Sequence, residues 1–394
     1  MGEAARKVGR RFFLGSVAAV GAMARAGLSF ASGAAGGGKV RTYYVAADEV
    51  EWDYCPTGIN QFTGKPFEGY AATFVERGPH AIGKVYRKVV YREYTDASFS
   101  KLKPRSPEDA YMGILGPSLF AEVGDTIRVV FKNHGERPYS MHPHGVFYDK
   151  DSEGAPYNDG VADDQKPGAA VPPGKTHVYT WPVPERAGPG PNDPSSVCWF
   201  YHSHVDEMRD INSGLAGFLV VTRRGAARPD GRPKDVDREF FTLFLMYDEN
   251  ESWYLDHNIN AYCGDPKGVN KLDNTPSDID GRYFVLGGMG FGPGNLKSAM
   301  NGFLFANMPM MKMKRGERVR WHVGTLGEGF NFHSPHWHGN TVLKNGSRID
   351  VLDISPAQAV TADMTPDNPG VWLYHCHVSD HMMMGMSARY QVLG

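Results

Sequence analysis

The sequence has few cysteines, little net charge and no long apolar run in its body. Its 394 residues include four cysteines, too few for a disulfide framework in so long a chain. The formal net charge is −2, and no basic cluster follows the first residues, which argues against a nucleic-acid partner. No run there approaches the ~18–20 apolar residues that a membrane span needs. These absences favour a globular protein with no nucleic-acid partner and no membrane span.

Segments with helical periodicity are also scarce. Short β-branched runs bounded by Gly, Pro, Asn or Asp recur instead, which is typical of an all-β protein of sandwich type. HPHG, WFYHSH and GLAGFLVV in the first half correspond to HWHG, LYHCH and GMSARYQVL in the second, about 190 residues later. This echo predicts two tandem β-sandwich domains, residues 39–223 and 239–394, with a polar linker at 224–238.

The amino-terminal segment differs in composition from the rest. Arg10 and Arg11 precede Phe-Phe-Leu, a mildly apolar stretch and then small residues. This order is typical of a twin-arginine export signal, which we expect at residues 1–35. The pattern predicts a protein that is exported after folding and works in the periplasm or outside the cell.

Histidine is the most informative residue type. Of fifteen histidines, ten fall in four short motifs. A purely structural role, without a metal, would require a hydrogen-bond partner for each buried imidazole. Metal ligation is therefore the stronger hypothesis. The motifs are HPH (His142, His144), HSH (His202, His204), HSPHWH (His333, His336, His338) and HCHVSDH (His375, His377, His381).

The spacing within these motifs suits neighbouring metal ions. In a strand, residues i and i+2 point to one face, about 7 Å apart, so an HxH strand offers its imidazoles to two ions. Cys376 lies between His375 and His377 and must point to the opposite face. The thiol therefore serves one metal site while the flanking histidines serve another. Two short covalent paths join the sites, as electron transfer requires.

The Cys376 site can be completed from the sequence. His381 and Met386 follow at intervals of five residues, and His333 supplies a second imidazole. Two histidines, one cysteine and a weak axial methionine are the ligand set of blue copper. Zinc also accepts thiolate and imidazole, but it rarely uses a thioether, so the methionine favours copper.

All four motifs, in order, resemble those of the multicopper oxidases, over essentially the whole chain after the signal. Stretches such as WDYCPTGINQFTGKPF, DENESWYLDHNINAYC and NGFLFAN are similar to the ceruloplasmin/hephaestin branch. The resemblance implies cupredoxin-like Greek-key domains and one type 1, one type 2 and two type 3 copper ions. It assigns His333, Cys376, His381 and Met386 to type 1, His142 and His336 to type 2, and His144, His202, His204, His338, His375 and His377 to type 3.

The first domain departs from this pattern. Ser203 replaces the cysteine, so only the second domain holds type 1 copper. The trinuclear ligands are divided between the two domains, so the cluster must lie where the two domain types meet. The resemblance to two-domain oxidases places that interface between neighbouring chains of a homotrimer.

The resemblance implies oxidation of a small reducing substrate at type 1 copper and four-electron reduction of O2 to water. Electrons would pass through Cys376 to His375 and His377, and Glu153 is a candidate proton donor. A copper nitrite reductase and a non-enzymatic copper protein are weaker alternatives.

The substrate remains open between a phenol and a metal ion, Fe2+ or Cu+. Asp380 matches a family iron ligand, whereas Pro293 and Ser298 stand where the family has Glu and His. Glu328 is a partial substitute, and the methionines at 308–313 and 382–384 are candidate Cu+ ligands.

Overall fold

The computed structural model describes residues 38–275, 277–279, 282–284, 290–327, 329 and 331–394, so the predicted export signal lies outside the described residues. Residues 40–222 form two sheets. The first has the order β2-β1-β4-β6 and the second the order β3-β8-β7-β5. Their strands are β1 (Val40–Asp53), β2 (Val85–Tyr94), β3 (Leu119–Glu122), β4 (Thr126–Asn133), β5 (His142–Pro143), β6 (Thr176–Pro182), β7 (Ser196–His202) and β8 (Ala216–Thr222).

Residues 238–393 form two further sheets, with the orders β12-β9-β14-β18-β16-β17 and β13-β20-β19-β15, and a separate β10-β11 hairpin. These strands are β9 (Arg238–Asp248), β10 (Ser277–Ile279), β11 (Arg282–Phe284), β12 (Leu296–Met300), β13 (Met311–Lys314), β14 (Val319–Gly324), β15 (Pro335–Trp337), β16 (Val342–Lys344), β17 (Ser347–Ile349), β18 (Ala359–Met364), β19 (Gly370–Cys376) and β20 (Ser387–Leu393).

The two pairs of sheets repeat one topology. β1 runs parallel to β4 as β9 runs parallel to β14, and β3 runs parallel to β8 as β13 runs parallel to β20. The antiparallel pairs β5–β7 and β7–β8 correspond to β15–β19 and β19–β20. The internal echo in the sequence therefore reflects a repeated β-sandwich, in agreement with the predicted all-β, cupredoxin-like fold class.

The helices are short and lie in the connections. Among the described residues, no helix is long and apolar enough to cross a membrane. The α-helices are α1 (Tyr70–Thr73), α2 (Glu207–Ser213), α3 (Leu255–Tyr262), α4 (Phe291–Gly294) and α5 (Ser379–Met383). The 3-10 helices are η1 (Pro107–Met112), η2 (Lys150–Ser152), η3 (Asp163–Gln165), η4 (Pro167–Ala169), η5 (Glu185–Ala187) and η6 (Pro266–Gly268).

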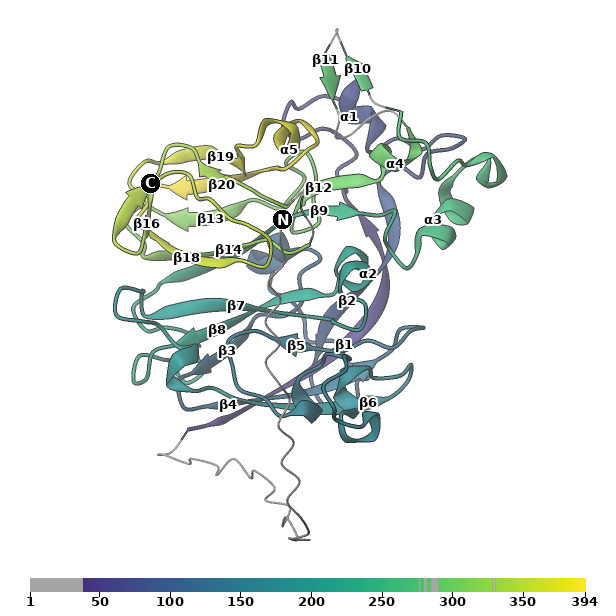
Figure 1. Ribbon diagram of the computed structural model, residues 1–394. Coiled ribbons are helices and arrows are strands. Elements are labelled where there is room, and N and C mark those ends of the chain that lie inside the picture. Colours follow the sequence, from purple (N-terminus) through teal and green to yellow (C-terminus); the bar gives the residue numbers. More distant parts are fainter. Residues whose placement is uncertain (1–37, 276, 280–281, 285–289, 328, 330) are drawn as a thin grey trace, which may run out of the picture. The chain divides into compact units, whose positions relative to one another are not determined.

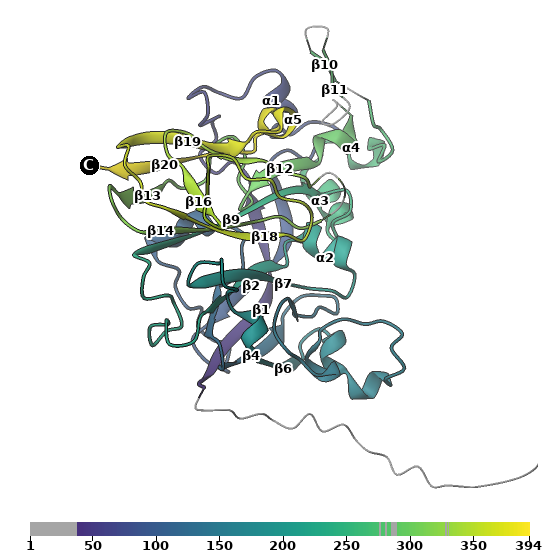
Figure 2. The ribbon, with the colours of Figure 1, turned by 60° about the vertical axis from the view of Figure 1, so that its left-hand side comes forward.

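The four main sheets lie one above another in both ribbon views (Figure 1, Figure 2). Strands β7 and β18 meet in the middle, where the Cys198 N–H donates to Thr361 Oγ1 at 3.2 Å. One hydrophobic core fills the sandwich of residues 40–222, and a second, larger one includes residues from both halves of the chain. The sheet that contains β19 is separated from the sheet that contains β7 by the sheet of β14 and β18.

A segment of the first half, residues 54–74, packs against the second half near α5. The Leu304 N–H donates to the Tyr54 carbonyl at 2.9 Å, and the rings of Phe67 and Phe305 lie 5.6 Å apart. Helix α1, at the end of this segment, lies beside α5 in both views (Figure 1, Figure 2). Because α5 contains His381, the first half of the chain contributes to the surroundings of that histidine.

Candidate metal centres

Strand β19 ends at Cys376, whose buried thiol faces two histidines from different parts of the chain. Its Sγ lies 3.7 Å from Nδ1 of His333 and 3.7 Å from Nδ1 of His381, and these nitrogens are 3.0 Å apart. The backbone of Met386 is held beside them, since its N–H donates to the His381 carbonyl at 3.0 Å and its carbonyl accepts from the Cys376 N–H at 3.1 Å. The structure thus brings together the side chains of His333, Cys376 and His381, three of the four predicted for the mononuclear site, with the backbone of the fourth, Met386, beside them.

The electrostatics of this cluster fit a bound cation. Burial lowers the pKa of His333 to about 3 and also lowers that of His381, so both imidazoles are neutral and can ligate. Burial raises the pKa of the Cys376 thiol to about 11. A cation among these donors would stabilise the thiolate, and a soft thiolate with two imidazoles and a thioether matches copper.

The other face of β19 presents a second group of histidines. His336 pairs with His375 across β15 and β19, with Nδ1 of His336 3.3 Å from Nε2 of His375. Nε2 of His338 is 3.0 Å from the same atom, and the ring of His377 lies 5.2 Å from that of His336. Nδ1 of His375 donates to the Cys376 carbonyl at 2.7 Å, which leaves its Nε2 as a free ligand atom. Burial lowers the pKa of His375 to about 4.

The first half contains a corresponding group. His142 of β5 pairs with His202 of β7, and the rings of His142, His144, His202 and His204 lie 5.1–5.6 Å from their neighbours. Nε2 of His144 and Nε2 of His202 are 3.1 Å apart. Burial lowers the pKa of His144 to about 4 and that of His202 to about 3, so these two imidazoles are neutral and their nitrogens are available to a metal.

A glycine after each HxH motif shapes both groups. Gly145 and Gly339 have positive φ values of 79° and 74°. A Cβ at Gly145 would lie 2.4 Å from Trp199, and one at Gly339 would lie 2.6 Å from Trp372. Each tryptophan precedes a histidine, His202 or His375, by three residues, so the glycine allows the HxH turn to pack against the strand that carries the partner histidines.

The two histidine groups do not meet within one chain. Among the described residues, each ring contact of the first group is internal or made with Tyr148 or Phe200, and those of the second group are internal. The groups belong to different sheets, with the β14 and β18 sheet between them. Six of the eight side chains are half-buried or exposed, namely His142, His144, His204, His336, His338 and His377.

In the first half, a hydrogen-bond network occupies the position that corresponds to the Cys376 site. The Ser203 hydroxyl donates to Asp210 Oδ2 at 2.6 Å, and Trp253 Nε1 donates to Asp210 Oδ1 at 2.9 Å. Asp210 and Ser203 are both buried, and burial raises the pKa of Asp210. Serine therefore has a structural role here, since it satisfies a buried carboxyl group.

Glu153 lies beside the first histidine group. Its carbonyl accepts from Nδ1 of His142 at 2.7 Å. Its carboxylate accepts from Lys150 Nζ at 2.6 Å and from the Tyr157 hydroxyl at 2.8 Å. The carboxylate is thus held by two donors, which the sequence pattern did not indicate because Lys150 lies in the short 3-10 helix η2 and Tyr157 lies in the loop after it.

Asp380 lies beside the Cys376 site, on α5 immediately before His381, and is half-buried. Burial lowers the pKa of His381, and the negative charge of Asp380 opposes this effect. Burial raises the pKa of Tyr70 in α1, and the same charge adds a smaller increase. Among the described residues, Asp380 belongs to no cluster of three or more potential metal-ligating groups.

Two of the three positions compared with the family iron ligands lack a carboxylate or an imidazole. Ser298 is completely buried in β12, with no hydrogen-bond partner for its Oγ, and Pro293 is buried in α4. Glu328 lies outside the described residues. Met308, Met311 and Met313 are buried in the core, whereas Met383 is 39% exposed on α5. Of the candidate Cu+ ligands, Met383 is thus available at the surface and these three are packed.

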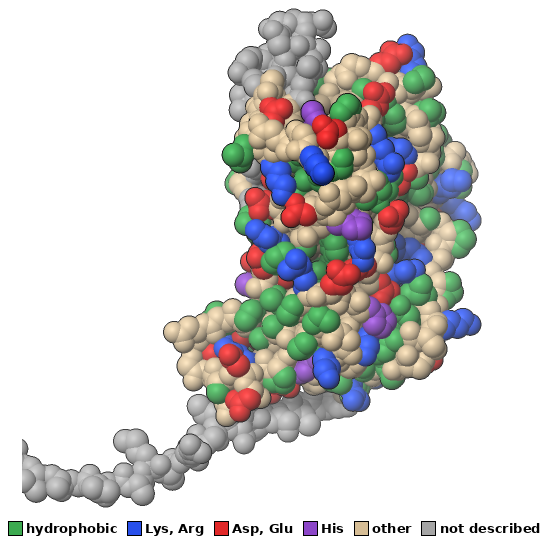
Figure 3. All heavy atoms as spheres, turned by 90° about the vertical axis from the view of Figure 1, so that its right-hand side faces the viewer, with side chains coloured by type: hydrophobic (Ala, Val, Ile, Leu, Met, Phe, Trp, Pro, Cys, Tyr) green, Lys and Arg blue, Asp and Glu red, His purple; other side chains and the backbone are tan. Residues whose placement is uncertain are grey.

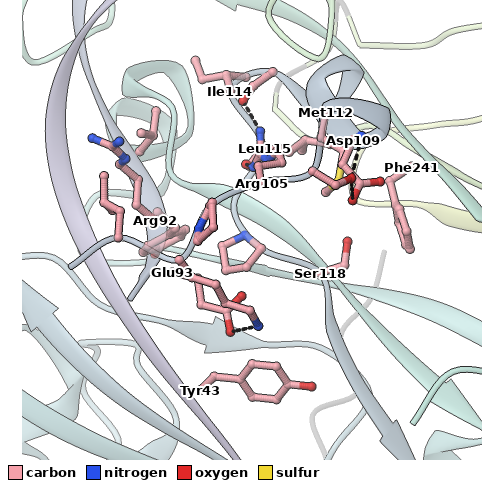
Figure 4. Close-up of a pocket in the computed structure, with 18 of the residues that line it drawn as sticks. Tyr43, Arg92, Glu93, Arg105, Asp109, Met112, Ile114, Leu115, Ser118 and Phe241 are labelled. Carbon is pink, nitrogen blue, oxygen red and sulfur yellow. Dashed lines mark hydrogen bonds and ion pairs between the residues drawn. The ribbon is translucent and has the colours of Figure 1, made fainter. Parts of the chain in front are cut away.

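A cavity of about 840 Å³ lies apart from both centres, between β1, β2, η1 and Phe241 (Figure 4). Arg105 at its wall donates to the carbonyls of Gly113 and Leu115, and Lys103 pairs with Glu93 at 2.8 Å. None of the predicted metal ligands lines this cavity.

Family models described as multicopper oxidase match residues 110–226 and 289–393, which together contain all the predicted copper ligands. The chain belongs to the multicopper oxidase family. It is 45% identical over 359 residues to "Ferroxidase HEPHL1" of Mus musculus, covering 90% of this chain and 29% of the relative. It is 42% identical to human hephaestin and 40% identical to rat ceruloplasmin, with 90% of this chain and 29% and 32% of the relatives covered. The chain spans about a third of the length of these relatives.

Solved structures support the same fold. A multicopper oxidase crystal structure matches with a TM-score of 0.53 and 18% identity, covering 90% of this chain and 89% of that one. A copper nitrite reductase from Nitrosomonas europaea matches with the same TM-score and 17% identity, covering 90% and 95%. Since an oxidase and a reductase fit equally well, these likenesses show the fold and do not distinguish the two activities.

Proposed function

We propose that the protein is an oxidase that couples one-electron oxidation of a reducing substrate at a type 1 copper to four-electron reduction of O2 to water at a trinuclear copper cluster. The observation that carries this proposal is strand β19. Its Cys376 points to a buried cluster of soft donors, while the adjacent His375 belongs to the histidine group on the opposite face. An electron can therefore pass from one centre to the other along a few covalent bonds of one chain.

The ligand assignment of this proposal uses all twelve predicted side chains. His333, Cys376, His381 and Met386 hold type 1 copper. The trinuclear cluster takes one type 2 ion, bound by His142 and His336, and two type 3 ions, bound by His144, His202, His204, His338, His375 and His377.

Backbone hydrogen bonds set the tautomer of three of these histidines before any metal binds. A carbonyl can only accept, so the contacts of Nδ1 of His142, His202 and His375 with backbone carbonyls require a proton on each Nδ1. Each Nε2 then presents a lone pair. Glu153, whose carbonyl fixes His142, is the carboxylate that we assign to proton supply, and Lys150 and Tyr157 hold it in place.

Oxygen uptake by copper-loaded protein is the direct test of the oxidase. Uptake with a reductant present, and its loss in Cys376→Ser, is the expected result. Copper-loaded protein that consumes no O2 with any reductant but reduces nitrite would instead identify a reductase, and copper binding without any turnover would identify a non-enzymatic protein.

We also assign the protein to a homotrimer whose trinuclear clusters lie between neighbouring chains. Support comes from the separation of the two histidine groups within one chain and from the accessibility of six of their eight members. Phe147, Tyr148 and Met208, close in sequence to the first group, are also exposed. Histidine side chains reach the surface in several places among apolar and charged ones (Figure 3). Active monomers in light scattering would contradict this assembly.

The electron donor is proposed from the surroundings of His381. The relative named a ferroxidase favours Fe2+, and Asp380 provides one carboxylate beside the site. Pro293 and Ser298, both buried, stand where the family has Glu and His, which favours a phenol or Cu+. Uptake of O2 with Fe2+, Cu+ and a phenol, measured side by side with wild type and Asp380→Asn, separates these donors. A ferroxidase would lose Fe2+ turnover in Asp380→Asn, whereas a Cu+ oxidase would lose Cu+ turnover in Met383→Leu.

The proposed location is the periplasm or the extracellular space, reached by the twin-arginine route. The support is Arg10 and Arg11 ahead of an apolar stretch in the first 35 residues. Replacement of both arginines by lysine should leave the protein in the cytoplasm, as cell fractionation would show.

A further inference from the structure

One buried side chain beside the Cys376 site has no part in the ligand set. Asn331 is 2% exposed and lies two residues before His333. Its Oδ1 accepts from the Met246 backbone N–H at 2.8 Å and lies 3.1 Å from Nε2 of His333. No spacing rule singles out an asparagine in a loop, so this contact was not predictable from the sequence.

These two contacts determine the chemistry at His333. A backbone N–H can only donate, so the asparagine atom that faces Met246 must be the oxygen. The same oxygen can only accept from His333, so Nε2 of the imidazole must carry the proton. The other ring nitrogen, Nδ1, is then unprotonated, and it is the atom that points at Cys376 and His381. Asn331 therefore selects the tautomer that can bind a metal.

The contact also fixes the orientation of the ring. Met246 belongs to β9, and Phe244 of the same strand packs its ring 6.0 Å from that of His333. β9 is an inner strand of its sheet, with β12 on one side and β14 on the other. One rigid strand thus constrains His333 twice, through the amide hydrogen bond to Asn331 and through an aromatic contact.

His381 lacks a comparable constraint. Among the described residues, the His381 side chain contacts Cys376 and His333 through Nδ1 and its ring face, and its Nε2 has no hydrogen-bond acceptor like Asn331. The two imidazoles of the site are therefore unequal. His333 is held against β9 through Asn331, and His381, which is also buried, lies on the short helix α5.

We propose that Asn331 is a positioning residue that presets the tautomer and orientation of His333 for copper, an inference that rests on the proposed type 1 site. A side chain that orients a metal-binding histidine typically changes metal affinity by about 10–100-fold when it is removed. Asn331→Ala should therefore weaken copper binding at the Cys376 site by about 10–100-fold. It should also alter the visible charge-transfer band and the electron paramagnetic resonance spectrum of the type 1 copper that still binds.

A matched control separates this role from general destabilisation. Asn258 is also completely buried, and its Oδ1 accepts from a backbone N–H, that of Arg87, at 2.7 Å. It lies on α3 and contacts none of the proposed copper ligands. Asn258→Ala should lower stability but leave the copper affinity and both spectra of the Cys376 site unchanged. Folded Asn331→Ala with wild-type affinity and spectra would overturn the proposal.

A conservative variant keeps the proposal testable if Asn331→Ala does not fold. Asn331→Asp retains an oxygen acceptor, so we expect copper binding to be preserved. A carboxylate is a stronger hydrogen-bond acceptor than an amide oxygen, and it makes the His333 imidazole a more basic ligand for the metal. The reduction potential of the type 1 copper should therefore fall. An unchanged potential in Asn331→Asp would contradict the positioning role.

The outcomes also separate this inference from the proposed function. Wild-type protein without a type 1 spectrum after copper loading would overturn both. Wild-type protein with that spectrum but without O2 consumption would overturn the oxidase alone, because the comparison of Asn331→Ala with Asn258→Ala uses binding and spectra rather than turnover.

Discussion

At the scale of single residues, the alternation of side chains along β19 explains how two different centres share one strand. Cys376 and His375 are adjacent and therefore point to opposite faces. The Cys376 thiol is buried with its imidazole partners, and the backbone carbonyl of the same residue orients His375 through Nδ1. One residue thus faces one cluster with its thiol and orients a histidine of the other group with its carbonyl.

Cys376→Ser tests the residue on which the proposed electron path depends. A hydroxyl is a poor ligand for copper compared with a thiolate, so the type 1 spectrum should disappear and O2 consumption should fall by more than about 100-fold. Copper content measured after dialysis should fall only by the type 1 share. Retention of the type 1 spectrum in the serine variant would show that the thiol is not a ligand.

The buried histidines predict an acid-sensitive metal-free protein. Burial lowers the pKa of His202 to about 3, against about 6.5 in an unfolded chain. Between these values the unfolded state binds a proton and the folded state does not, so stability falls as the pH falls from about 6.5 toward 3. The contribution is about 1.4 kcal/mol per pH unit within that window.

Urea unfolding of metal-free wild type and His202→Gln at several pH values checks this expectation. The variant should lose less stability than wild type between pH 6.5 and pH 4, because the proton-linked contribution of His202 is absent. Parallel profiles for the two proteins would contradict it. His80→Gln provides a control, since the side chain of His80 is 53% exposed.

At the scale of secondary-structure elements, a buried ionic cluster joins strands of the two halves. Lys88 of β2 and Glu249, which follows β9, are completely buried and paired, and the Tyr54 hydroxyl donates to the same carboxylate. Lys297 of β12 lies nearby, and burial lowers its pKa to about 7. Strands of the two halves are therefore held in one arrangement by a group of buried ionisable side chains.

Removal of one member of this cluster should be strongly destabilising. Glu249→Ala leaves the Lys88 ammonium buried without its carboxylate, which typically costs about 3–5 kcal/mol of the free energy of unfolding. Replacement of both partners by apolar residues, Lys88→Met with Glu249→Leu, should be much less destabilising. Glu136→Ala, which removes a 75% exposed partner of Arg87, should change stability by less than about 1 kcal/mol. Equal losses in Glu249→Ala and in the double variant would contradict this account.

At the scale of the whole molecule, the central feature is that one chain holds two incomplete histidine groups in different sheets. The repeated topology brings two HxH motifs together at the same place in each sandwich. They lie at β5 and β7 in the first sandwich and at β15 and β19 in the second. A closed ring of chains would bring the first group of one chain to the second group of the next, and each interface would then be equivalent.

Complementation between inactive chains tests this arrangement. A chain with His142→Ala and His144→Ala keeps an intact second group, and a chain with His336→Ala and His338→Ala keeps an intact first group. Each should be inactive alone. Trimers assembled from an equal mixture should regain activity at about one interface in four, as random ordering of the chains in a ring requires. No recovery in mixed trimers, verified by light scattering, would place each cluster within one chain.

The sequence by itself determined the all-β class, the internal repeat and the candidate ligands, because strand alternation and ligand chemistry are local properties of the chain. The copper assignments of individual histidines remain predictions. Tertiary structure decided what depends on distant partners. It placed Asn331 between Met246 and His333, buried Ser298 where a family iron ligand stands, and gave Ser203 a carboxyl partner in Asp210. Hydrogen bonds and burial join residues far apart in sequence, and no periodicity in the sequence encodes them.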